Sequence, residues 1–74
     1  MLTKFLVRLE WDSEYDGYVA YVPSLPGCVS QGKNEREALS NVGDAIQVYI
    51  ESLKSTGQPI PSGDGDVYTI EVAA

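Results

Sequence analysis

The sequence predicts an α+β domain in which one helix packs on an antiparallel-rich sheet, with the elements in the order β-β-β-α-β. Three observations support this fold class. Apolar and polar residues alternate along residues 3–11 and 67–72, as in half-buried strands. Two short extended segments flank a turn that contains two prolines. Residues 35–55 carry apolar side chains at three- and four-residue steps, which is typical of a helix that buries one face.

The first strand is predicted over residues 3–11. Its apolar positions share one face, which we expect to point into the core: Phe5, Val7, Leu9 and Trp11. The polar residues 12–17 follow and end in Asp-Gly, which indicates a hairpin. The first two strands should therefore pair antiparallel, and the third should join the same sheet.

The second strand, residues 18–22, is rich in β-branched and aromatic residues. Pro23 ends it, because proline has no N–H to donate to a sheet. Residues 25–28 fit a type II turn, with Pro26 at the second position and Gly27 at the third, where the φ angle is positive. The two prolines and Gly27 are thus predicted to shape the connection between strands.

A third strand is predicted over residues 28–31, followed by the helix over residues 35–55. Asn34 and Glu37 have the spacing of a capping box at the start of this helix. Gly57 stands where a C-terminal cap belongs. The expected core face of the helix consists of Ala38, Leu39, Val42, Ala45, Ile46, Tyr49, Ile50 and Leu53. The other tyrosines in predicted core elements are also expected to pack: Tyr18, Tyr21 and Tyr68.

Several of these segments resemble one protein family. The sequences DGYVA at 16–20, VPSLPGC at 22–28, QG at 31–32 and EAL at 37–39 are similar to those of HicB-like antitoxins. The resemblance runs from about residue 3 to residue 72, and it implies a HicB-like fold related to a partial ribonuclease-H-like arrangement. It further implies a type II toxin-antitoxin system, in which the antitoxin covers the active face of a small basic HicA-type toxin that cleaves mRNA.

Longer members of that family carry a C-terminal ribbon-helix-helix or helix-turn-helix segment that binds operator DNA. Nothing follows Ala74 in this sequence. We therefore expect residues 1–74 to form a single HicB-like domain that covers the toxin, without a DNA-binding domain.

A chain of 74 residues is expected to be one domain with a small core, since folding at this size buries only about 60% of the unfolded surface. One cysteine excludes an internal disulfide, and the absence of histidine excludes the usual zinc sites. Support is expected from self-association, as a homodimer or homotetramer, or from a protein partner. A stand-alone homo-oligomer without a toxin remains the alternative function.

The net charge of −6 disfavours direct binding to nucleic acid and favours a basic protein partner. The alternative explanation of this net charge is that the protein is acidic only for solubility. Tyr15 stands among acidic residues, either as part of a contact surface or as an idle loop residue. The predicted contact set for a partner is Glu10, Asp12, Glu14, Tyr15 and Asp16.

Three catalytic or metal-binding interpretations have less support in the sequence than a binding role. Residues 12–17 imitate the first half of an EF-hand loop, but Pro23 stands where a bidentate glutamate is needed. Cys28 has no histidine to activate it, so a packing role is expected. A two-metal hydrolase built on Glu10 and Asp12 needs carboxylates that no spacing brings together. We therefore expect no catalytic residue, metal or cofactor.

The amino-terminal residues 1–5 alternate between apolar and polar instead of forming the apolar region of a signal peptide. No apolar run approaches the length of a membrane span. These features predict a cytoplasmic protein.

Overall fold

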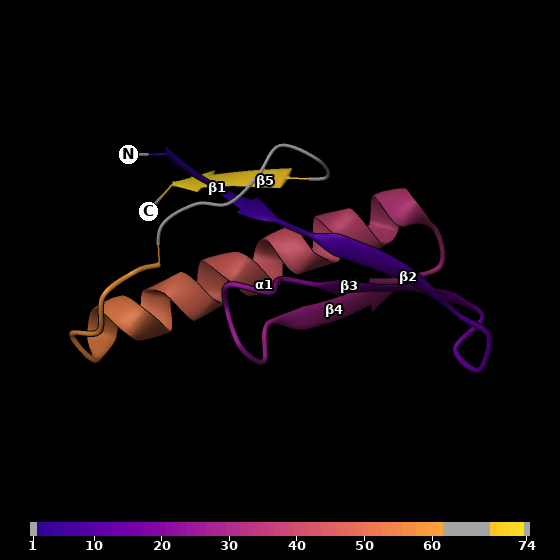
Figure 1. The fold of residues 1–74 in the computed structure, drawn as a ribbon, viewed down its shortest axis with the longest axis horizontal. Coiled ribbons are helices and arrows are strands. Elements are labelled where there is room, and N and C mark those ends of the chain that lie inside the picture. Colours follow the sequence, from indigo (N-terminus) through magenta and orange to yellow (C-terminus); the bar gives the residue numbers. More distant parts are fainter. Residues whose placement is uncertain (1, 62–68, 74) are drawn as a thin grey trace.

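The computed structural model describes residues 2–61 and 69–73. One long helix lies against strands that form two small antiparallel sheets (Figure 1). The α+β fold class predicted from the sequence is confirmed. The elements in chain order are β1 Leu2–Leu6, β2 Arg8–Asp12, β3 Gly17–Tyr21, β4 Val29–Gly32, α1 Glu35–Ser55 and β5 Thr69–Ala73.

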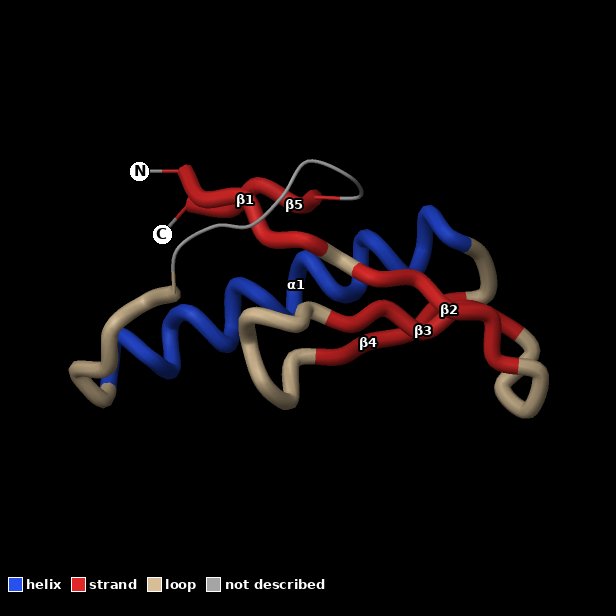
Figure 2. Tube along the Cα trace, in the orientation of Figure 1, coloured by secondary structure: helices blue, strands red, loops and turns tan. Residues whose placement is uncertain are grey.

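The single strand predicted for residues 3–11 is divided at Val7 into β1 and β2 (Figure 2). β1 pairs with β5 in one sheet, so that Phe5 lies opposite Ile70. β2 pairs with β3 in the other sheet, whose strand order is β2-β3-β4. The prediction of one strand was wrong because alternation reports an extended chain and does not reveal where that chain changes partners. Val7 is itself buried, with 1% of its surface exposed.

The last strand was predicted over residues 67–72, and the structure places β5 at Thr69–Ala73. Residues 67 and 68, with the tyrosine predicted to pack there, lie outside the described residues. The same holds for the preceding polar turn at residues 62–66.

The connection between β3 and β4 consists of two successive turns. The N–H of Leu25 donates to the carbonyl of Val22 at 3.0 Å, and the N–H of Cys28 donates to the carbonyl of Leu25 at 2.9 Å. Gly27 has a φ of 83°, as the third position of a type II turn requires. Pro23 and Pro26 each occupy the second position of one of these turns, which confirms their predicted role in shaping the connection.

The helix begins and ends as its flanking residues predict. Asn34 Oδ1 accepts a hydrogen bond from the N–H of Glu37 at 2.8 Å, and Glu37 Oε1 accepts one from the N–H of Lys33 at 2.9 Å. At the other end, Gly57 has a φ of 72°. Its N–H donates to the carbonyl of Lys54, and the N–H of Gln58 donates to the carbonyl of Leu53. These two bonds form a Schellman motif.

Replacement of Asn34 by alanine is expected to lower the free energy of unfolding by about 1 kcal/mol, because the Glu37 N–H loses its partner. Urea unfolding followed by circular dichroism measures this. Asn34→Ser is the control, since serine keeps an oxygen at the cap. Equal stability of Asn34→Ala and the wild type would show that this cap contributes nothing.

The core lies between the helix and the strands. α1 contacts β3, β4 and β5. The fully buried helix positions recur at four-residue steps and lie within the predicted face, while Leu39, Ala45 and Tyr49 pack at its margins. The buried residues are Phe5, Val7, Ala20, Val22, Leu25, Cys28, Ala38, Val42, Ile46 and Ile50.

Two aromatic residues expected in the core are exposed instead. Trp11 exposes 55% of its surface and Tyr21 exposes 40%. Trp11 is the second-last residue of β2, and Tyr21 is the last residue of β3. For Trp11, the strand pattern identifies the face but not how far the covering helix extends over it. Tyr21 lies opposite Arg8 and between the buried Ala20 and Val22, so it points to the side of the sheet away from the helix.

Gly32 lies where β4 passes closest to the start of the helix. A Cβ at this position would lie 2.7 Å from the carbonyl carbon of Glu37 and 2.8 Å from the Cα of Ala38. Both atoms belong to the helix backbone and cannot rotate away. The contact between β4 and α1 therefore requires glycine.

Among the helical residues that the structure describes, none forms a segment long and apolar enough to cross a membrane.

Candidate functional site

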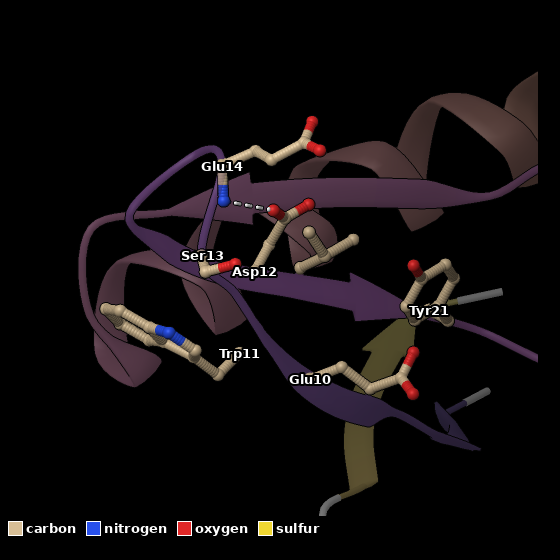
Figure 3. A pocket seen from close by; sticks show the side chains of 7 residues that line it. Glu10, Trp11, Asp12, Ser13, Glu14 and Tyr21 are labelled. Carbon is tan, nitrogen blue, oxygen red and sulfur yellow. Dashed lines mark hydrogen bonds between the residues drawn. The ribbon is translucent and has the colours of Figure 1, made fainter.

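An acidic depression of about 420 Å³ lies on the strands β2 and β3 and on the loop between them. We call this the acidic depression throughout. Figure 3 shows its carboxylates and Tyr21 on one side of the strands, while the ring of Trp11 points away from them. The lining residues are Glu10, Trp11, Asp12, Ser13, Glu14, Val19 and Tyr21.

The loop that carries these residues is held by Asp12. Its Oδ1 accepts hydrogen bonds from the N–H of Glu14 at 2.9 Å and from the N–H of Tyr15 at 3.2 Å. Its backbone carbonyl accepts a third bond, from the N–H of Asp16 at 2.8 Å. Asp12 thus fixes the turn with one carboxylate oxygen, and its negative charge stays at the surface of the acidic depression.

Three carboxylates line the acidic depression, and among the residues that the structure describes no cation lines it. Arg8 approaches Glu10 at 3.8 Å, but both side chains are more than half exposed, and ion pairs of this kind contribute little. The surface therefore presents a net negative field to an approaching partner.

Trp11 is the largest apolar side chain at this site. Its ring meets the ring of Tyr18 edge to face, with the centroids 5.3 Å apart. This contact packs the indole against Tyr18 while more than half of the residue stays exposed. An exposed tryptophan is the kind of side chain that anchors protein interfaces.

The structure brings together three of the five residues predicted to contact a partner, namely Glu10, Asp12 and Glu14. Tyr15 and Asp16 do not line the acidic depression. Tyr15 is half-buried, and the Nζ of Lys33 lies 4.5 Å from the centroid of its ring. Asp16 is exposed at the end of the hairpin loop with a φ of 61°.

Sequence reasoning missed Trp11 and Tyr21 as members of this surface. Trp11 alternates with polar residues as core side chains do, and Tyr21 stands in an apolar run in which alternation identifies no face. A usable signal existed for Trp11. Trp11 stands at the end of a strand, directly before the acidic loop. A helix of limited length does not cover the sheet there, so a side chain at this position stays exposed.

Within the described ranges 2–61 and 69–73, no three His, Cys, Asp or Glu side chains are placed to hold a metal ion together. Cys28 lies in the core with 6% of its surface exposed, away from the acidic depression. Burial raises the pKa of its thiol above the ordinary value, which lowers the fraction of reactive thiolate.

Cys28 is expected to react with a disulfide reagent at pH 8 at least about 100-fold more slowly in the folded chain than in urea. Burial raises the pKa of the Cys28 thiol, so the folded state favours the protonated form. The stability that this preference contributes is lost as the pH rises through the raised pKa. Absorbance of the released thiolate measures the rate, with free cysteine as the control. Equal rates in buffer and in urea would contradict the buried position.

Comparisons with known proteins agree with this fold. A sequence model described as HicB_like antitoxin of bacterial toxin-antitoxin system matches residues 5–71. A UPF0150 protein of Thermoplasma acidophilum is 50% identical over 56 residues, which cover 74% of this chain and 81% of the relative. A UPF0150 protein of Synechocystis is 48% identical over 54 residues, which cover 72% of this chain and 68% of the relative.

Two solved structures share the fold. The N-terminal domain of the Burkholderia pseudomallei antitoxin HicB matches with a TM-score of 0.73 at 20% identity, covering 95% of this chain and 93% of that one. A chain of the HicA3 and HicB3 toxin-antitoxin complex matches with a TM-score of 0.65 at 23% identity, covering 97% and 93%. The resemblance seen in the sequence is thereby confirmed, and the chain belongs to the HicB_like antitoxin family of bacterial toxin-antitoxin systems.

Proposed function

We propose that this chain is an antitoxin that neutralises a small basic HicA-type toxin, an mRNA-cleaving ribonuclease, by binding and covering its active face. Membership of the antitoxin family supports this role. The structural likeness to a chain of a HicA3 and HicB3 toxin-antitoxin complex supports a HicA-type protein as the partner. The proposed action is occlusion, in which no residue of this chain performs chemistry. Because such a toxin acts on mRNA, the proposed place of action is the cytoplasm.

The observation that carries the proposal is the composition of the acidic depression. Glu10, Asp12 and Glu14 supply negative charge, and Tyr21 supplies exposed aromatic surface beside it. A protein that binds RNA carries lysine and arginine on its RNA-binding face, to neutralise phosphates. Carboxylates placed beside an exposed tyrosine suit such a face, because charge steers the encounter and an aromatic ring helps to hold the complex.

The acidic depression also explains how one surface could compete with RNA. In this proposal its carboxylates would take the positions that phosphates otherwise take on the partner. Binding would therefore weaken as salt is added, because the attraction between exposed charges is screened. The aromatic contacts would persist under the same conditions.

A pull-down from native cells, with the chain as bait, tests the proposal. We expect a small, basic, histidine-containing protein of the HicA type, identified by its mass and sequence. Expression of that protein alone should arrest growth, and co-expression of this chain should restore it. Recovery of the chain alone, or growth arrest that co-expression does not relieve, would contradict the proposal and favour the stand-alone oligomer.

A further inference from the structure

Tyr15 packs against its own hairpin and does not point into the acidic depression. The residue is half-buried, and its ring lies over the backbone of Gly17, the first residue of β3. A Cβ at position 17 would lie 2.8 Å from Cε2 and 2.9 Å from Cδ2 of this ring. Any side chain at position 17 would therefore displace the ring, so Tyr15 and Gly17 pack as one unit where the loop joins β3.

Lys33 reaches the same ring from the segment between β4 and α1. Its Nζ lies 4.5 Å from the centroid of the Tyr15 ring, within the range of about 6 Å over which a cation is attracted to an aromatic face. The backbone of Lys33 is held by the helix cap, since its N–H donates to Glu37 Oε1 at 2.9 Å. Among the described residues, no carboxylate forms an ion pair with this lysine. The Tyr15–Lys33 contact therefore connects the hairpin loop to the start of the helix.

The hydrogen bonds of the loop stay within the hairpin itself. The N–H groups of Glu14, Tyr15 and Asp16 all donate to Asp12. Asp16 has a φ of 61°, in the left-handed region that is unfavourable for a residue with a side chain. A loop with such a residue needs surrounding contacts that favour it over more relaxed conformations. Lys33 supplies a contact of this kind from outside the hairpin.

We propose that Tyr15 and Lys33 are positioning residues for partner binding, because their contact holds the loop in the conformation in which Asp12 and Glu14 line the acidic depression. This inference rests on the proposed function, since it gives the contact a role in binding the toxin. A loop that is ordered before binding loses no conformational freedom at that step, so the affinity is higher. Tyr15 acts through Glu14, its neighbour in the chain, and does not itself touch the partner.

The charge of Lys33 separates this role from a purely electrostatic one. In a chain of net charge −6, loss of a lysine makes the field more negative and should strengthen the attraction of a basic partner. Loss of the Lys33 ammonium also releases the Tyr15 ring, which should weaken binding. Lys54 is the matched control, because it is exposed near the end of α1 and has neither a ring nor an ion pair as partner among the described residues. Lys33→Met and Lys54→Met should therefore change the affinity in opposite directions.

Amide hydrogen exchange of the free, full chain tests whether the contact holds the loop. Relative to unfolded peptides of the same sequence, the N–H groups of Glu14 and Asp16 should exchange about tenfold faster in Tyr15→Ala and about threefold faster in Lys33→Met. Tyr15→Phe keeps the ring and should match the wild type. Unchanged exchange in Tyr15→Ala would overturn the proposal. So would an equal acceleration at Ile46 in the core of α1, because it would show a loss of overall stability instead of a loosened loop.

Calorimetric titration with the HicA-type protein tests whether the ordered loop serves binding. Tyr15→Ala should raise the dissociation constant about tenfold and Lys33→Met about threefold, whereas Tyr15→Phe should bind like the wild type. A Tyr15→Phe variant as weak as Tyr15→Ala would make the hydroxyl a direct contact and overturn the positioning role. A faster loop with unchanged affinity, or a Lys33→Met variant that binds as tightly as Lys54→Met, would also overturn it. If the wild type bound no such protein, the proposed function would fail, while the exchange rates would still decide whether Tyr15 and Lys33 hold the loop.

Discussion

Glu10→Lys combined with Glu14→Lys is expected to weaken binding of the HicA-type protein recovered with the chain about 30-fold, which corresponds to about 2 kcal/mol. Both carboxylates line the acidic depression, and neither accepts a hydrogen bond that maintains the loop among the described residues. The double reversal replaces two attractions with two repulsions against a basic surface. Calorimetric titration at low salt measures the affinity.

The matched control is Asp44→Lys combined with Glu51→Lys, which changes the net charge by the same amount on the exposed side of α1. The control should lower the affinity only slightly, through the general field. Asp12→Asn adds a further test, because asparagine keeps the Oδ1 that accepts from Glu14 and Tyr15 and loses only the charge. Equal losses in the double reversal and its control would show that net charge, and not the acidic depression, governs binding.

Gly32→Ala is expected to lower the free energy of unfolding by about 3 kcal/mol, a large part of the stability of so small a domain. The added methyl group would overlap the backbone of Glu37 and Ala38, so β4 and the start of α1 must separate. Because β4 packs against the helix, this separation opens the core. Urea unfolding monitored by tryptophan fluorescence measures the change.

Gly57→Ala is the control for the conformational cost of replacing glycine. Gly57 has a φ of 72°, and a Cβ there meets nothing within 4 Å, so only backbone strain of about 1 kcal/mol is expected. The difference between the two variants then measures the overlap at Gly32. If Gly32→Ala were no more destabilising than Gly57→Ala, the close passage of β4 against the helix would be wrong.

The helix and the turns were predictable because local chemistry specifies them. Asn34 has to satisfy a free N–H at the helix start, and Gly57 supplies the positive φ at its end. Pro26 and Gly27 admit few turn types besides type II. In each case the residues that determine the geometry lie within a few positions of one another, so no knowledge of the tertiary structure was needed.

The division of the first strand and the exposure of Trp11 and Tyr21 depend on the tertiary structure. Alternation assigns Trp11 to the same face as Phe5, but the helix covers that face only in part. The change of partner at Val7 depends on where β5 returns, more than 60 residues later in the chain. A one-dimensional pattern contains neither fact.

The acidic part of the candidate site could be predicted from composition, since Glu10, Asp12 and Glu14 fall near one hairpin. The place of Tyr21 at this site could not be predicted in the same way, because it stands in an apolar run between Ala20 and Val22. Only the pairing of the strands shows that Tyr21 lies opposite Arg8, on the face that carries Glu10.

Titration of toxin activity tests the central claim most directly. The HicA-type protein would cleave a labelled RNA while this chain is added in increasing amounts. We predict that cleavage falls in proportion to the chain added and stops once every toxin molecule is bound, and that Glu10→Lys with Glu14→Lys needs a large excess to achieve the same. Cleavage that continues at full rate with the wild-type chain in tenfold excess would contradict the account.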